Sequence, residues 1–326
     1  MKLLLTIVIA LAARRSYSSS IPDVSKISGV DLVEYVNRIQ DDFVVGLVNA
    51  TIDEMRTKVM LSRYADAHSD ETLAGAVDDV ADAIPDAFDA REHLPNCASI
   101  RLIRDQTNCG ACWAFAAAEV MSDRVCIATR GARQPILSAE DALACCGQSC
   151  GLGCSGGYLI KALEFFNRRG VVTGGDYLGG GCKPYTVPPC DHAHCKPAET
   201  PQCHETCQSG YSKSFSDDKH FGKSAYAVAK TVAAIQTEIM TNGPVSAAIT
   251  VHEDFYKYKS GVYHHVAGPD LGGHAIKIIG WGSENGNDYW LAANSWGSGW
   301  GEDGFFRFRR GVDECGIESG VVAGLV

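Results

Sequence analysis

The chain has 326 residues, of which 39 are acidic and 29 basic, so its formal net charge is −10. No basic tract interrupts this acidic balance, and we therefore expect no nucleic acid among its partners, because nucleic-acid binding needs a positive surface. The 14 cysteines all lie between Cys97 and Cys315, which divides the chain into a cysteine-free first part and a cysteine-rich remainder.

Residues 1–20 are typical of a signal peptide. Lys2 precedes an apolar run that starts at Leu3 and ends at small residues around Ala13. That run is too short to span a bilayer, and no later stretch is apolar enough to do so, so we expect no membrane partner. The sequence therefore predicts a protein of the secretory pathway. There, an even and dense set of cysteines indicates a disulfide framework.

Residues 21–83 are predicted to form a detachable prosegment. Apolar residues between positions 32 and 59 recur at helical spacing, and residues 65–83 form an Asp/Ala-rich stretch typical of an exposed, cleavable linker. One hypothesis is that acidic pH neutralises the Asp cluster at 78, 79 and 82 and loosens the prosegment; the alternative is a simply solvated acidic run. Asn49 begins the Asn-Ala-Thr glycosylation sequon.

The mature part, residues 84–326, is long enough for two lobes. Residues 84–210 are predicted to be a mainly helical lobe, with a helix from Cys112 to Arg130, a short helix capped by Ser138 and an amphipathic helix over 159–169. Residues 211–326 are predicted to hold a helix at about 227–241 and β-type runs at 245–251, 275–281, 289–293 and 305–308. The fold class is therefore α+β, with an antiparallel sheet or barrel beside the helical lobe and a cleft between them.

Cys112 is the first candidate catalytic residue. It stands at the predicted start of a helix, where unpaired N–H groups and the helix dipole lower the pKa of a thiol. Gln106, six residues earlier, can aim a side-chain NH₂ at a developing oxyanion. Cys109 and Cys112 also have the C-x-x-C spacing of a redox dithiol or half a zinc site. We favour the nucleophile because no βαβ pattern and no second pair of metal ligands accompany them.

The predicted β lobe supplies the partners of a nucleophilic cysteine. His274 follows two glycines at the mouth of a buried strand, and Asn294 ends a second strand two residues before Trp296. A Cys–His pair oriented by an Asn amide follows the logic of a catalytic triad. Taken alone, His274 fits a satisfied core histidine equally well. The catalytic interpretation depends on Cys112 and Asn294 occurring in matching contexts.

The chain resembles the papain family of cysteine proteases from about residue 32 to its end, and within it the cathepsin B branch. The matching segments are 106–115, 138–141 with the cysteines at 145 and 146, 154–158, 182–185, 188–192, 218–220, 272–276, 293–297 and 315–319. The segments 182–192 and 315–319 distinguish the cathepsin B branch. The resemblance implies a papain-like two-lobed fold with the active site in the cleft.

The same resemblance implies the roles of individual residues. It makes Cys112 the nucleophile, His274 the base, Asn294 its orienting partner and Gln106 the oxyanion donor together with the Cys112 N–H. Trp296 would shield the Asn–His bond from water. The substrate-binding residues that it implies are Gly156, Gly157, Ala248, Gly320, Trp296, His192 and His194. The disulfides that it implies are Cys97–Cys126, Cys109–Cys154, Cys145–Cys203, Cys146–Cys150, Cys182–Cys207 and Cys190–Cys195, with Cys112 and Cys315 free.

The sequence departs from the cathepsin B pattern in the loop that occludes the primed end of the cleft. His192 keeps the first of two adjacent histidines, with Asp105 as its expected partner, but the second position is Ala193. The loop is also shorter, and His194 lies one place further along. We therefore expect weakened peptidyl-dipeptidase activity with endopeptidase activity retained. A zinc knot formed by the loop's two cysteines and two histidines is the alternative, which an oxidising compartment disfavours.

The second departure is Gly320, which stands where cathepsin B has a glutamate at the bottom of the S2 pocket. Glu318 matches a different family position. With Ala248 and Leu159 as expected pocket neighbours, a hydrophobic P2 side chain should be preferred over Arg, because the charge-assisted partner of Arg is missing.

Together these features predict a cysteine endopeptidase that is made as a zymogen and is active at acidic pH after prosegment removal. We expect no cofactor and no metal. The expected partners are peptide and protein substrates, the chain's own prosegment as inhibitor, and cystatin-type inhibitors. The alternative is a papain-like chain that has lost catalysis and serves as a binding protein, but such chains usually lack the nucleophile.

Overall fold

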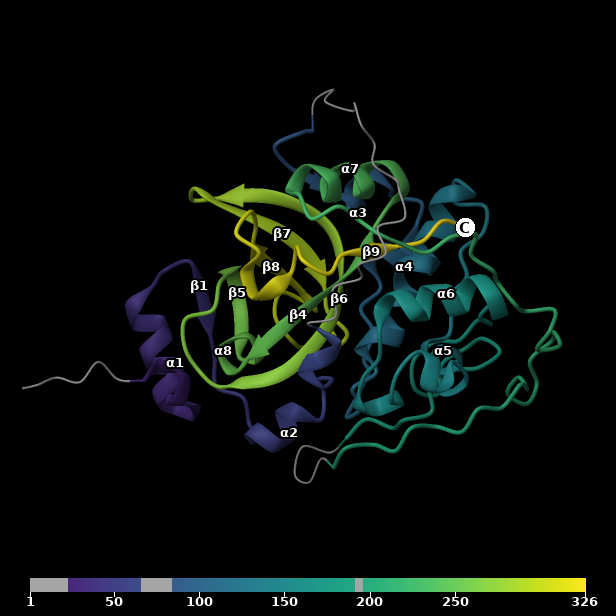
Figure 1. The fold of residues 1–326 in the computed structure, drawn as a ribbon, viewed down its shortest axis with the longest axis horizontal. Helices are drawn as coiled ribbons and strands as arrows, with labels where there is room; N and C mark the ends of the chain where they lie inside the picture. The colour runs from purple at the N-terminus through teal and green to yellow at the C-terminus, as the bar shows by residue number, and fades with distance from the viewer. Residues whose placement is uncertain (1–22, 66–83, 191–195) are drawn as a thin grey trace, which may run out of the picture.

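The computed structural model of the chain describes residues 23–65, 84–190 and 196–326 (Figure 1). The predicted signal peptide, the Asp cluster at 78, 79 and 82, and the loop positions His192, Ala193, His194 and Cys195 lie outside these residues. Among the described residues, no helix is both long and apolar enough to cross a bilayer.

The described part of the prosegment contains two α-helices and a strand: α1 (Gly29–Ile39), β1 (Phe43–Val45) and α2 (Ile52–Arg56). Helix α1 buries Leu32 and Val36, which share one face because they are four residues apart. A capping box starts α2, in which the Thr51 side chain accepts from the Glu54 N–H and the Glu54 carboxylate accepts from the Thr51 N–H. The prediction of helical structure here is correct, but it missed β1.

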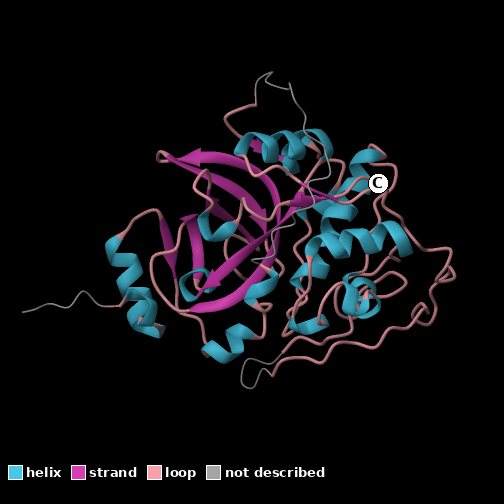
Figure 2. Cartoon of the chain, viewed as in Figure 1, coloured by secondary structure: helices cyan, strands magenta, loops and turns pink. Residues whose placement is uncertain are grey.

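The helical lobe is built on α4 (Cys112–Ala128), α5 (Ala139–Cys145) and α6 (Leu159–Arg169), and Figure 2 shows these helices grouped on one side of the molecule. Every residue of α4 from Cys112 to Cys126 is buried, as expected of a helix that lies in the centre of a fold. Ser138 caps α5 by accepting from the Asp141 N–H at 2.9 Å. Gly170, with a φ of +63°, ends α6.

The β lobe consists mainly of one sheet. Its strands are β2 (Phe88–Asp89), β3 (Tyr226–Ala227), β4 (Val245–His252), β5 (Tyr258–Tyr263), β6 (Asp270–Glu284), β7 (Asn287–Ala293), β8 (Phe305–Arg309) and β9 (Val322–Ala323). Within the described residues the order is β1-β5-β8-β7-β6-β4-β9-β3, with β2 added beside β6. The pairing is antiparallel except between β5 and β8, which are parallel, so the predicted purely antiparallel sheet needs this correction. The helices of this lobe are α3 (Ala90–His93), α7 (Val232–Asn242) and α8 (Glu253–Tyr256).

Strand β6 carries His274, the candidate base of the site. It is buried from Leu271 to Gly282 and pairs with β4 on one side and β7 on the other, with His274 opposite Ile249 of β4. The sequence predicted only residues 275–281 as a strand, because the two glycines before His274 interrupt the pattern.

Two hydrophobic cores lie one in each lobe, and the prosegment contributes to both. Leu32 and Phe43 belong to the β-lobe core, whereas Met60 and Tyr64 belong to the helical-lobe core. The start of the mature part also lies in the β lobe, because β2 pairs with β6 and Ile100 packs in the β-lobe core. The predicted lobe boundary, which put residues 84–210 together, therefore assigned this first stretch to the wrong lobe.

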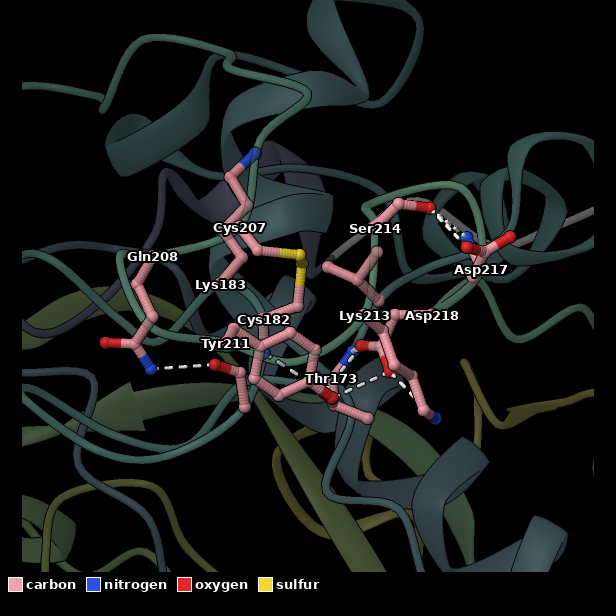
Figure 3. Close-up of a disulfide and its surroundings, with 12 residues drawn as sticks. Thr173, Cys182, Lys183, Cys207, Gln208, Tyr211, Lys213, Ser214, Asp217 and Asp218 are labelled. Carbon is pink, nitrogen blue, oxygen red and sulfur yellow. Dashed lines mark hydrogen bonds and ion pairs between the residues drawn. A yellow bond between two sulfur atoms is a disulfide. The ribbon is translucent and has the colours of Figure 1, made fainter.

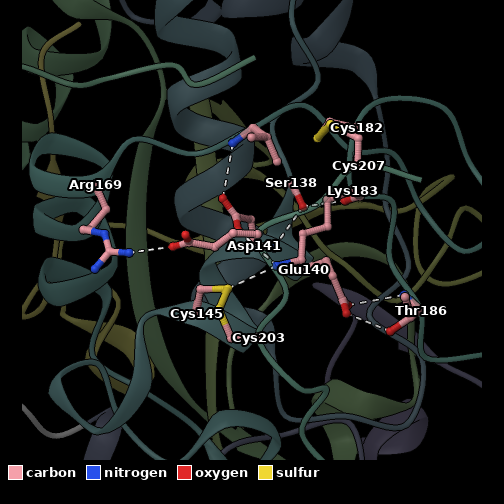
Figure 4. Close-up of polar contacts among 12 residues, drawn as sticks. Ser138, Glu140, Asp141, Cys145, Arg169, Cys182, Lys183, Thr186, Cys203 and Cys207 are labelled. Carbon is pink, nitrogen blue, oxygen red and sulfur yellow. Dashed lines mark hydrogen bonds and ion pairs between the residues drawn. A yellow bond between two sulfur atoms is a disulfide. The ribbon is translucent and has the colours of Figure 1, made fainter. Parts of the chain in front are cut away.

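Disulfides and buried carboxylates hold the long loops of the helical lobe. Five of the six expected disulfides lie within the described residues: Cys97–Cys126, Cys109–Cys154, Cys145–Cys203, Cys146–Cys150 and Cys182–Cys207. Cys190 is also disulfide-bonded. Beside Cys182–Cys207, buried Asp218 accepts from Thr173 Oγ1 at 2.6 Å and Tyr211 Oη at 2.8 Å (Figure 3). Beside Cys145–Cys203, buried Asp141 pairs with Lys183 at 3.1 Å and Lys219 at 2.9 Å (Figure 4).

Candidate active site

Cys112 and His274 come from the two lobes: Cys112 belongs to α4 and His274 to β6, and these two elements pack against each other. Cys112 is the first residue of α4, and the backbone N–H of Ala275, the residue after His274, is close enough to its thiol to lower the pKa of that thiol. Cys112 and Cys315 are the free cysteines of the described residues, as expected. A thiol at the start of one lobe's helix therefore lies beside the strand that carries the histidine of the other lobe.

The hydrogen bond between His274 and Asn294 defines the protonation of the imidazole. His274 Nε2 lies 2.8 Å from Asn294 Oδ1, and the same oxygen accepts from the backbone N–H of Ser295 at 2.7 Å. Because a backbone N–H can only donate, the atom facing both groups is the amide oxygen, so Nε2 carries the proton. His274 Nδ1 is buried and has no hydrogen-bond partner among the described residues. In its neutral form, His274 thus keeps Nδ1 as the basic nitrogen.

Trp296 covers this hydrogen bond. Its ring centroid lies 4.5 Å from that of His274, and the indole itself is only 6% exposed. Asn294 and His274 are equally inaccessible, with exposures of 1% and 0%. A buried hydrogen bond is protected from competition with water, so the orientation of the imidazole is well defined.

Gln106 is held by a network that leaves one amide hydrogen directed at the cleft. Its Oε1 accepts from Ser295 Oγ at 2.7 Å, and its Nε2 donates to the Cys109 carbonyl at 2.7 Å. The second Nε2 hydrogen bond goes to the carbonyl oxygen of Lys58 in the prosegment, at 3.0 Å. Trp296 Nε1 donates to the same oxygen at 3.3 Å. A prosegment carbonyl therefore occupies the position where Gln106 would meet a substrate oxygen.

The prosegment fills the rest of the cleft with residues 58–65. Met60 forms a two-way antiparallel bridge with Gly273, with N···O distances of 2.7 and 2.8 Å, and the Leu61 N–H donates to the Ser155 carbonyl at 3.1 Å. Glycines allow this approach: a Cβ on Gly156, where φ is +119°, would lie 2.6 Å from the Met60 Cβ. The prosegment therefore contacts both lobes, because Gly273 belongs to the β lobe and Gly156 to the helical lobe.

Burial changes the ionisation of Cys112 and His274. Burial raises the pKa of the Cys112 thiol to about 12, although nearby backbone N–H groups oppose the shift. Burial likewise lowers the pKa of His274 to about 4, against a smaller effect of the bond to Asn294. The helix start predicted an early-titrating thiol; in this proenzyme the loss of solvation outweighs the helix dipole, so the pair is neutral.

The expected substrate-pocket residues lie near one another. A Cβ on Gly320 would be 3.9 Å from the Ala248 Cβ, and Ala248 packs in the same core as Leu159. No large side chain stands between Gly320 and Ala248. Gly157 has no space for a side chain, since a Cβ there would lie 2.7 Å from the Trp113 ring. The two loop histidines expected at the primed end lie outside the described residues, and Asp105, the expected partner of the first, accepts from the Thr107 N–H at 2.8 Å.

Comparison with known proteins places this geometry in a family. Residues 84–325 match the family described as papain family cysteine protease. The chain belongs to the papain family of cysteine proteases. A "Gut-specific cysteine proteinase" of Caenorhabditis elegans is 58% identical over 301 residues, covering 92% of each chain. "Cathepsin B-like cysteine proteinase 3" of the same organism is 53% identical and covers 90% of this chain and 81% of its own length.

Solved structures agree with this assignment. The proCathepsin B S9 of Trypanosoma congolense has a TM-score of 0.79 at 33% identity, over 92% of this chain and 98% of that one. The predicted α+β papain-like fold and the predicted cathepsin B-like cysteine protease class are both confirmed. Papain-family precursors with lower identity, such as the digestive procathepsin L 3 of Tenebrio molitor at 19%, share the fold.

Sequence reasoning missed two groups at this site. Ser295 links Gln106 to Asn294, because its hydroxyl donates to Gln106 and its N–H donates to the Asn294 side chain. Its position directly after Asn294 could have indicated this role in the sequence. The Lys58 carbonyl meets both Gln106 and Trp296. No side-chain pattern can reveal a backbone carbonyl, so this second contact was not accessible from the sequence.

Proposed function

We propose that this chain is the zymogen of a cysteine endopeptidase in which Cys112, His274, Asn294 and Gln106 perform the catalysis. The observation that carries the proposal is the unpartnered, buried Nδ1 of His274 beside the Cys112 region, with its Nε2–H fixed on Asn294. That tautomer makes Nδ1 the proton acceptor for a thiol. The family assignment gives only the class of enzyme, and the roles of these four residues are our proposal.

In the mechanism, the thiol of Cys112 transfers its proton to His274 Nδ1, and the thiolate attacks the carbonyl carbon of the scissile bond. Gln106 Nε2–H and the Cys112 backbone N–H receive the negative oxygen of the tetrahedral intermediate. His274 then gives the proton to the leaving amine, which departs and leaves a thioester on Cys112. Water then loses a proton to Nδ1 and attacks the thioester. The carboxylic acid product is released, and the Cys112 thiol is regenerated with the proton from His274.

The prosegment serves as the inhibitor of this machinery. It occupies the oxyanion donor with the Lys58 carbonyl and keeps the thiol and imidazole neutral by burying them. Both effects disappear when residues 58–65 leave the cleft, because water then solvates the charged pair. Asn49 is exposed on this segment, so a glycan there would leave with the prosegment.

Acid activation has a candidate anchor in Asp42 of the prosegment. Its carboxylate pairs with Arg309 at 3.3 Å and accepts from Asn287 Nδ2 at 2.7 Å, and His264 lies 3.7 Å away. Burial and the neighbouring Arg309 lower the pKa of His264, so this imidazole becomes charged only in acid. Protonation of His264 Nδ1 then removes the acceptor that faces Arg309 Nη2 at 3.0 Å and places a second cation there, which weakens the anchor. This anchor is a second candidate pH sensor beside the Asp cluster at 78, 79 and 82, which stays a prediction.

Substrate preference follows from the two departures in the sequence. The missing side chain at Gly320 opens an uncharged space next to Ala248, which favours apolar P2 residues over Arg. In the occluding loop, His192 keeps the first histidine of the family pair, and His194 lies one place beyond the second position. This change supports endopeptidase action with residual peptidyl-dipeptidase activity. Delivery to a lysosome or a gut lumen is proposed from the signal peptide and from the name of the gut-specific relative. Cystatin-type inhibitors would bind the open cleft.

The test is acid activation of the purified proenzyme followed by cleavage of a peptide library. We expect internal cleavage with apolar P2 residues, and a loss of at least about 10⁴-fold for Cys112→Ala or His274→Ala. Wild-type protein that is processed by an added protease yet cleaves nothing would instead favour the inactive, peptide-binding alternative. Dipeptide release that exceeds internal cleavage would contradict the weakened exopeptidase.

A further inference from the structure

A buried ion pair joins the two elements that carry the catalytic residues. Lys277 of β6 is 0% exposed, and its Nζ lies 2.9 Å from Asp123 Oδ2 of α4, which is also 0% exposed. Glu119, one turn earlier on α4, lies 3.9 Å from the same Nζ, and the Ser99 carbonyl accepts from it at 3.4 Å. Arg104, the other cation near Glu119, is paired with Asp176 at 2.7 Å. We call Lys277 with Asp123 the helix–strand joint.

The joint and Cys112 both lie where α4 packs against β6. Side chains two apart in a strand point to one side, so Lys277 shares its side of β6 with Ala275, which packs in the same core as Cys112. Residues seven and eleven apart in a helix share one face, so Cys112, Glu119 and Asp123 form one stripe of α4. The same contact surface thus holds the thiol at one end and the ion pair about 16 Å further along the helix axis.

We propose that the helix–strand joint is a positioning element for catalysis, which sets where the Cys112 sulfur stands relative to His274. This inference rests on the proposed function. An apolar contact allows one element to slide along another, whereas a buried ion pair has one favourable geometry and is strongly destabilised when its partners separate. A shift of α4 along β6 would separate Lys277 from Asp123. A misplacement of about 1 Å between reacting groups can reduce the rate about 100-fold.

The chain contains a matched control on the same helix. Arg124, the residue after Asp123, is 2% exposed and pairs at 2.9 Å with Glu238 of α7, which is 9% exposed. That pair fixes α4 to a helix that carries no catalytic residue. If burial of charge on α4 matters only for stability, the two pairs should behave alike; if the joint positions the thiol, only one should affect catalysis.

The experiment replaces each pair by apolar residues of similar size, Lys277→Met with Asp123→Leu and Arg124→Met with Glu238→Leu, in the full proenzyme, which is then acid-activated. For the joint variant we expect kcat to fall about 100-fold with KM changed less than about threefold. We also expect the pH profile of Cys112 alkylation by iodoacetamide to move toward that of an unpaired thiol, with a pKa of about 8.5. The single substitution Lys277→Arg keeps a cation opposite Asp123, so this variant should have the wild-type kcat.

The control variant should lose thermal stability but keep the wild-type kcat and alkylation profile. Equal kinetic losses in both variants, or a wild-type profile in the joint variant, would overturn the proposal. If the joint variant does not fold, Asp123→Asn keeps the shape and removes the attraction, and an unchanged alkylation profile there would also reject it. An inactive wild-type enzyme would reject the proposed function itself, which separates the two failures.

Discussion

Replacement of Glu119 by glutamine should change how stability depends on pH. Burial raises the pKa of Glu119 from 4.5 to about 7, and the nearby Lys277 only partly opposes this shift. Below about pH 4.5 the carboxyl is protonated in the folded and unfolded states alike. As pH rises toward 7 the unfolded state loses its proton first, so the free energy of unfolding falls, and the loss is complete above the folded pKa.

The magnitude follows from the two pKa values. At about 1.4 kcal/mol for each pH unit between them, ionised Glu119 lowers the free energy of unfolding by about 3 kcal/mol near pH 8. A glutamine side chain at this position would have nearly the same shape and no ionisation. Glu119→Gln should therefore match the parent protein at pH 4 and exceed its stability by about 3 kcal/mol at pH 8.

The assay is urea unfolding of the proenzyme between pH 4 and pH 8, in a Cys112→Ala background that prevents self-cleavage and with disulfides intact. Glu164→Gln, which removes a carboxylate from a partly exposed pair with Lys161, is the control for loss of a carboxylate outside the buried core. Parallel stability curves for the parent and Glu119→Gln over this range would refute the reasoning.

Three further predictions concern activation and specificity. Asp42→Asn should raise the pH midpoint of self-activation, measured by processing on gels, whereas the exposed neighbour Asp41→Asn should leave it unchanged; equal shifts would reject the anchor. Gly320→Glu should raise kcat/KM for P2-Arg substrates over P2-Leu about tenfold or more, and an unaltered ratio would remove Gly320 from the pocket. At pH 7, iodoacetamide should alkylate Cys112 at least about 100-fold more slowly in the proenzyme than in the mature enzyme, by mass spectrometry in a Cys315→Ser background; comparable rates would contradict the buried, neutral thiol.

The fold was predictable where local patterns agree with the tertiary structure. The helix that begins at Cys112 has no internal Gly or Pro, so its extent was nearly correct, and Ser138 acts as the cap that its sequence indicated. Local patterns failed where long-range pairing decides the structure. Strand β1 has three residues and exists because β5 lies beside it, and the parallel β5–β8 pair joins segments that are far apart in sequence. The crossing of β2 to the β lobe is a contact of the same kind.

The sequence by itself determined the family of this protein and pointed to its candidate catalytic groups, because residue types and their immediate neighbours carry both: a thiol at a helix start, an imidazole at a strand mouth, and amides at Gln106 and Asn294. Only the tertiary structure decided the state of that chemistry. The Lys58 carbonyl on Gln106, the neutral thiol and imidazole, and the Lys277–Asp123 joint all come from segments distant in the chain. Burial and hydrogen bonding depend on what surrounds a residue in space, and no local pattern contains that information.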